Sequence, residues 1–285
     1  MARRTFADVL KNGEINIKLE YAKLKEEFYG RGLDDNKSLR SLCSRYFLSY
    51  HFRGTFLSLD EFDVITGFTS FFHTDSVNID SFVSFCEYSI NLLLPVLADP
   101  ETQHYSMALY KYNKIEVYIQ QVRLLIDKIG YMETTDKEHD VIIFVPKSQE
   151  AIAVSEIIDP SVSYKTIEYN HHSMKGNLDK KRETLRIYAD LLEAQRKNLK
   201  AINSSLEQDV FSLFNNINIR HNNADSQSPN FHKYIADMSD EELEDWYDET
   251  YQLCLLCFLE LDNVERKKKI KELNENIKNS DKPNQ

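Results

Sequence analysis

Apolar residues recur every three or four positions along most of this chain, which is the period of an amphipathic α-helix. The segments that follow this period are residues 17–28, 37–56, 78–97, 102–129, 148–158, 177–202, 206–219 and 239–266. Glycines end two of them, since Gly30 follows the first and Gly130 follows the fourth. The pattern therefore predicts a mainly α fold.

One short stretch departs from the helical period. Residues 131–135 and 141–145 are two runs rich in β-formers on either side of a polar turn, and Pro146 ends the second run. Such a pair predicts a small β-hairpin. The composition shifts again around residues 164–176. We therefore expect a helical N-terminal domain over residues 1–163 with the hairpin near 131–145, a second helical domain over 164–266, and a charged, disordered tail over 267–285.

The composition agrees with a helical protein. The 285 residues include only 7 Gly and 6 Pro, but 16 Tyr and 16 Phe, so breakers are scarce and aromatic rings are available to fill the spaces between helices. No run approaches eighteen consecutive apolar residues, so no membrane span is expected. Residues 1–6 lack the apolar core of a signal peptide, which predicts a cytoplasmic protein.

The four cysteines do not predict a disulfide framework or a metal site. Cys254 and Cys257 have the spacing of half a zinc site, but they lie in a Leu-rich helix with no second pair to complete the ligands. Packing in the core is the simpler interpretation. We expect no metal and no cofactor.

The net charge of −11 is unevenly distributed. Residues 175–200 contain eight Lys or Arg against four acids, whereas residues 207–262 contain thirteen acids against Arg220 and Lys233. These opposite segments can pair with each other, within one fold or across a dimer. Alternatively, the basic segment can form a groove for RNA, with Lys180, Lys181 and Arg182 as the phosphate contacts.

Arg220-His221-Asn222-Asn223, at the end of a helical run, is the best candidate for chemistry. A guanidinium matches a phosphate with two parallel hydrogen bonds, and imidazole can move a proton near neutral pH. The amides of Asn222 and Asn223 can hold the ring or the phosphate, and His232 can supply a second proton-transfer group. The same residue types also end helices, because cations satisfy the last carbonyls and asparagine tolerates the left-handed turn.

Several enzyme classes lack their signatures in this sequence. There is no glycine-rich phosphate loop, no nucleophile elbow and no His-Glu-x-x-His motif. Nucleotidases, serine hydrolases and zinc peptidases are therefore disfavoured.

Four short runs in the second half resemble a HEPN-type helical domain, similar to those of bacterial abortive-infection and toxin-like proteins. They are residues 175–181 (KGNLDKK), 211–216 (FSLFNN), 219–223 (IRHNN) and 246–248 (WYD), within a likeness over roughly 170–264. The resemblance implies a HEPN-like four-helix bundle that forms a homodimer. It also implies a metal-independent endoribonuclease of a phage-defence or toxin–antitoxin system, with Arg220 on the scissile phosphate and a nearby histidine moving the proton.

The sequence departs from the HEPN pattern at the histidine. Residues 224–227 contain none, so the role falls to His221 or His232. Two functions therefore stay open. One is RNA cleavage by 2′-hydroxyl attack. The other is a non-catalytic module that binds RNA or a regulatory protein partner, with the acidic last helix as the recognition face.

Overall fold

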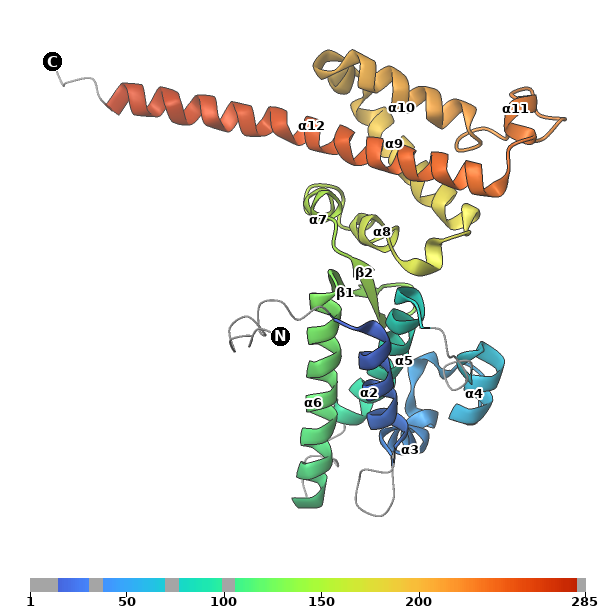
Figure 1. Ribbon diagram of the computed structural model, residues 1–285. Coiled ribbons are helices and arrows are strands. Elements are labelled where there is room, and N and C mark those ends of the chain that lie inside the picture. Colours follow the sequence, from blue (N-terminus) through green and yellow to red (C-terminus); the bar gives the residue numbers. More distant parts are fainter. Residues whose placement is uncertain (1–14, 31–37, 70–76, 99–105, 281–285) are drawn as a thin grey trace, which may run out of the picture. The chain divides into compact units, whose positions relative to one another are not determined.

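The computed structural model describes residues 15–30, 38–69, 77–98 and 106–280, and the chain divides into two compact units, Met1–Pro146 and Lys147–Gln285 (Figure 1). Helices dominate both units, and the described residues hold one two-stranded sheet. The predicted mainly α class is confirmed. The division lies at Pro146 rather than at residue 163, because α7 packs against α8 and α12 of the second unit.

The first unit is built around one buried helix, α5. Its described elements are α2 (Ile17–Tyr29), α3 (Leu39–Tyr46), η2 (Phe47–Ser49), η3 (His51–Arg53), α4 (Leu59–Thr66), α5 (Ile79–Ala98), α6 (Ser106–Lys128), β1 (Tyr131–Asp136) and β2 (Val141–Pro146). α5 packs against α2, α3, α6 and β2. Aromatic rings fill the core as the composition predicts, with Phe28, Phe82, Phe85 and Tyr118 all buried.

The predicted hairpin forms next to α5. β1 and β2 pair antiparallel, with Tyr131 opposite Pro146 and Asp136 opposite Val141. The Asn91 side chain on α5 accepts from the Ile142 amide (2.8 Å) and donates to the Ile142 carbonyl (2.7 Å). These bonds satisfy backbone groups that no third strand pairs, and they fix the hairpin on the helix.

A buried ionic cluster links α3, α4 and α5. Asp63 is almost fully buried and accepts from the Arg40 guanidinium (2.5 Å) and from the Tyr88 hydroxyl (2.9 and 3.0 Å). Arg40 also reaches the exposed Asp60 (2.6 Å). A buried carboxylate needs such partners, since an unpaired one is costly to desolvate. The cluster therefore holds three helices together in an otherwise aromatic core.

Within the described residues, α5 is also the one helix long and apolar enough to cross a membrane by length and composition. More than half of its apolar window, 56%, is buried inside the first unit. A core helix of a folded domain has these same properties, so the helix by itself is weak support for a membrane span.

The second unit is a group of long helices with short connectors. Its elements are α7 (Gln149–Ser155), α8 (Ser163–Glu168), η6 (His172–Met174), α9 (Leu178–Ile202), α10 (Ser204–Asn216), α11 (Lys233–Ala236) and α12 (Asp240–Ser280). α9 packs against α10 and α12, and α12 also packs against α7 and α10. The core contains Tyr188, Phe211, Tyr251, Cys254 and Cys257, all buried.

Polar caps set the helix boundaries largely where the sequence predicts them. Asn177 accepts from the Lys180 amide (3.2 Å) at the start of α9, and Ser239 accepts from the Glu242 amide (3.2 Å) at the start of α12. Asn203 caps α10 by accepting from the Leu206 amide (3.1 Å).

α12 is longer than the sequence predicts. It runs for 41 residues to Ser280, and so includes most of the stretch predicted to be a disordered tail. The reason is local. Alternating Lys, Glu and Asn residues with no Gly or Pro have good or tolerable helix propensity, and ion pairs such as Lys268–Glu265 (2.6 Å) support the helix surface.

Candidate functional site

The loop that carries Arg220-His221-Asn222-Asn223 follows α10 and is held from inside by Asn223. Asn223 is fully buried, and its side chain donates to the carbonyls of Asn215 (3.0 Å) and Asn230 (2.9 Å). Its carboxamide oxygen accepts from the amide of Asn218 (2.8 Å), which adopts a left-handed φ of 62°. These three bonds join the side chain to the last turn of α10 and to two points of the loop. These contacts give Asn223 a structural role, and its role in substrate binding stays a prediction.

Arg220 is occupied as well. Its guanidinium donates to the Glu193 carboxylate (2.6 Å) and to the carbonyl of Ala189 (2.6 Å), both on α9. It also lies over the rings of Phe211 (5.4 Å) and Phe214 (5.5 Å) on α10. Only 20% of the side chain is exposed. This residue therefore ties the loop to two helices, and a phosphate would have to compete with Glu193 for it.

The ion pair with Arg220 changes the pKa of the Glu193 carboxyl. The hydrogen bond from the Arg220 guanidinium holds the pKa of the Glu193 carboxyl below its ordinary value. The carboxylate is therefore charged at neutral pH, and the ion pair with Arg220 is intact there.

The two candidate histidines lie at opposite ends of the same loop. His221 and His232 are both exposed, and the backbone amide of His232 donates to the carbonyl of Asn223 (2.8 Å). Asn222 is exposed and donates to Asp225 (3.3 Å). Both imidazoles are therefore open to solvent, whereas the Arg220 guanidinium contacts α9 and α10.

The basic segment pairs with the acidic one inside the unit. Lys181 is buried and contacts Glu244 (2.7 Å) and Asp248 (2.6 Å) on α12, which gives it a structural role, and its role in RNA binding stays a prediction. Arg196 pairs in the same way with the buried Glu207 (2.6 Å). Arg182 donates to the carbonyl of Ile219 (3.4 Å), whereas Lys180 is exposed. Opposite charges of the two segments therefore form ion pairs that stabilise the second unit.

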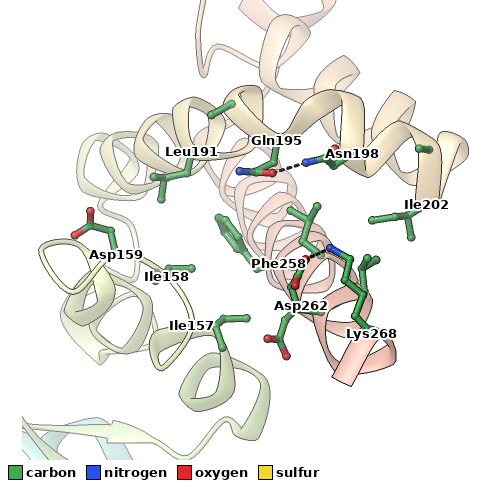
Figure 2. Close-up of a pocket in the computed structure, with 15 residues that line it drawn as sticks. Ile157, Ile158, Asp159, Leu191, Gln195, Asn198, Ile202, Phe258, Asp262 and Lys268 are labelled. Atoms are coloured by element: carbon green, nitrogen blue, oxygen red, sulfur yellow. Dashed lines mark hydrogen bonds and ion pairs between the residues drawn. The ribbon is translucent and has the colours of Figure 1, made fainter. Parts of the chain in front are cut away.

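A groove that the sequence did not reveal lies elsewhere in the second unit. Its volume is about 710 Å³, and its apolar lining includes Ile157, Ile158, Leu191, Ala194, Ala201, Ile202, Phe258, Leu261 and Val264. Figure 2 shows these side chains approaching from three segments, namely the turn after α7, α9 and α12. A concave, mostly apolar site of this size is the usual form of a ligand-binding site.

The charged groups along the groove are mainly acidic. Asp159, Asp262 and Glu265 line it together with one cation, Lys268, so three carboxylates and one ammonium give a formal charge of −2. Lys268 is paired with Glu265 (2.6 Å), and Asp262 is paired with Arg266. Asp159 accepts from the Ser161 amide (2.8 Å). The combination of an apolar floor and an acidic border favours an amphipathic ligand with positive charge.

One sequence signal for this groove exists, but it is weak. Ile157 and Ile158 come directly before Asp159-Pro160, where the chain must leave the helix. Two isoleucines at such a point can pack inward or remain at the surface, and Ile157 stays 37% exposed.

Comparison of the chain with protein-family models, with curated proteins and with solved structures found no match. The HEPN resemblance therefore stays a prediction, and the functional argument depends on the geometry of the two sites just described.

Proposed function

We propose that the second unit is a non-catalytic binding module, and that it holds a basic, amphipathic segment of a partner protein in the groove between α9, α12 and the turn after α7. The observation that carries the proposal is the apolar groove of about 710 Å³ with its acidic border. The state of Arg220 supports it, because the guanidinium predicted to contact the scissile phosphate is engaged by α9 and α10. Such a module would correspond to an inactive HEPN-like domain.

The groove suits an apolar side-chain row more than a small polar ligand. Most of its lining is aliphatic, and Phe258 supplies an aromatic ring. A helix with leucines on one face and lysines beside them would bury the leucines on Ile158, Leu261 and their neighbours. Its lysines would lie near Asp159, Asp262 and Glu265. Apolar contacts would supply most of the affinity, and the acidic border would select a partner with positive charge.

A labelled 18-residue peptide of leucine and lysine with helical spacing tests this proposal. We expect the full chain to bind it, and the double variant Ile157→Asp/Ile202→Asp to bind at least about 10-fold more weakly, since two apolar contacts are lost. Fluorescence anisotropy gives both dissociation constants. Each of these isoleucines is 37% exposed, so the substitutions are compatible with folding.

Matched controls distinguish peptide binding in the groove from non-specific binding elsewhere on the protein. Val64→Asp/Ile65→Asp changes two exposed aliphatic residues of α4, in the first unit, and should leave peptide binding unchanged. A peptide of leucine and glutamate should bind more weakly than the lysine peptide. Raising the ionic strength from about 0.1 to about 1 M should reduce that difference, because the screening length falls from about 10 to about 3 Å. Equal binding of both peptides, or full binding by the groove variant, would contradict the proposal.

Endoribonuclease activity is the second candidate. The observation in its favour is that His221 and His232 are both exposed on the loop that carries Arg220, and that Lys180 is exposed at the start of α9. Cleavage would require Arg220 to leave Glu193 and turn toward a bound phosphate. The cost of that rearrangement is the reason that we place this function second.

A further inference from the structure

The last part of α12 presents an exposed apolar stripe. From residue 265 to residue 278 every side chain is exposed, while the same helix is buried at Cys254, Leu255 and Cys257. Figure 1 shows this red end of α12 continuing past α9 and α10. On this part, Ile270, Leu273 and Ile277 are 57%, 58% and 49% exposed. A helix otherwise made of Lys, Glu and Asn gains nothing in water from three large aliphatic residues on one face.

The stripe has the spacing of a coiled coil. Ile270, Leu273 and Ile277 are three and four residues apart, and the same period leads back along α12 to Arg266, Asn263, Leu259 and the exposed Leu256. In heptad notation, the a positions are Leu256, Asn263, Ile270 and Ile277, and the d positions are Leu259, Arg266 and Leu273. The seam spans three heptads, or about 32 Å at about 1.5 Å per residue.

The residues on the seam select a particular kind of pairing. Isoleucine at a with leucine at d favours two parallel strands, and a single asparagine at an a position fixes register and strand number. Asn263 occupies such a position. Arg266 at d is the least favourable residue. Its guanidinium already bonds Asp262 on the same helix, so its aliphatic stem can line the seam while its charge stays outside.

The flanking charges are compatible with an identical partner. In a parallel pair, the g position of one heptad faces the e position of the next heptad in the other strand. Asp262 at g then faces Lys267, and by symmetry this attraction occurs twice. Lys269 at g faces Asn274, so no two lysines oppose each other across the seam. The same surface is therefore complementary to itself, as a two-fold interface requires.

We propose that two copies of this chain associate through a parallel, two-stranded coiled coil formed by the α12 seam from Leu256 to Ile277. This interface differs from a dimer through the bundle faces, which the HEPN resemblance implies. It does not use the apolar floor of the groove, since Phe258, Leu261 and Val264 lie on the opposite side of α12 from the seam, and Asp262 is the one residue that borders both surfaces.

Sedimentation velocity on the full chain tests the association. We expect a species of twice 33.5 kDa, which the double variant Ile270→Asp/Leu273→Asp converts to a monomer, with the dissociation constant raised about 100-fold or more. The matched control is Lys271→Asp/Lys278→Asp, which places two aspartates on the same part of the helix but off the seam, and should leave the dimer intact. A monomeric wild type, a trimer, or a control that also dissociates would overturn the proposal.

A cysteine at one seam position tests the parallel orientation. Ile270→Cys should form a disulfide-linked dimer under mild oxidation, because equivalent a residues face each other in a parallel pair, whereas Lys271→Cys should not. The native cysteines Cys43, Cys86, Cys254 and Cys257 are all buried, so they contribute little background. A dimer without this cross-link would contradict the parallel arrangement.

Discussion

Asp63→Ala is expected to lower the free energy of unfolding of the first unit by about 3–5 kcal/mol. The substitution removes the carboxylate that the Arg40 guanidinium and the Tyr88 hydroxyl both use in the core. Arg40 would keep only Asp60 as an acidic partner, and Asp60 is 82% exposed. Leaving a cation nearly buried without its counter-ion is far more costly than losing a pair at the surface. Urea unfolding followed by circular dichroism measures the change.

Asp60→Ala is the matched control for this prediction. It removes the other carboxylate bound to Arg40, but from an exposed site, and should cost less than about 1 kcal/mol. If Asp63→Ala unfolds at the same urea concentration as Asp60→Ala, the cluster does not hold α3, α4 and α5 together as described.

Arg220→Ala has the second largest expected effect, a loss of about 2 kcal/mol of stability in the second unit. The variant loses two charge-assisted hydrogen bonds, to Glu193 and to the Ala189 carbonyl, and the contact of the guanidinium with two phenylalanine rings. A catalytic arginine free in a cleft would behave differently, since its removal would leave unfolding unchanged. Thermal and urea unfolding therefore separate a structural role from a purely catalytic one.

Arg186→Ala is a suitable comparison for Arg220→Ala. Arg186 lies on α9 and is exposed, so its removal should change stability by less than about 0.5 kcal/mol. Arg220→Lys should be intermediate, because an ammonium keeps the charge near Glu193 but cannot bond the carboxylate and the Ala189 carbonyl in the same planar geometry. An Arg220→Ala protein as stable as Arg186→Ala would show that the guanidinium does not tie the loop to the helices.

Much of the fold could be predicted from local sequence. The apolar period places α2, α5, α6 and α9 within a few residues of their bounds, and the hairpin follows from two β-rich runs around a polar turn. These features depend on neighbours in the sequence. The predicted end of α12 was wrong, because a charged stretch without glycine or proline is compatible both with a solvated helix and with disorder.

The candidate site was harder, because its meaning depends on residues far apart in the chain. Arg220 is a sound phosphate ligand by type, but Glu193, 27 positions earlier, determines what it binds. Lys181 likewise reads as a surface cation until α12 brings Asp248 to it, 67 positions later. The groove needs three segments to meet, and no single one of them carries a recognisable motif.

The distribution of charge along the second half of the chain was more informative about its contacts than the Arg220-His221-Asn222-Asn223 motif was. The basic and acidic segments predict pairing within one fold or across a dimer, or else a groove for RNA, and the contacts of Lys181 and Arg196 show pairing within one chain. The pairing occupies Lys181 and Arg196, two of the cations that a nucleic acid could otherwise contact. The acidic border of the groove is therefore the charged surface that most clearly favours one kind of partner, a positively charged one.

Incubation of the purified full chain with labelled single-stranded RNA, in the presence of EDTA, tests most directly whether Arg220 holds the structure or acts on RNA. We predict no product with a 2′,3′-cyclic phosphate end from the wild type above the level given by Arg220→Ala, together with lower stability of that variant. Cleavage by the wild type that disappears in an Arg220→Ala protein of unchanged stability would contradict this account and favour the endoribonuclease.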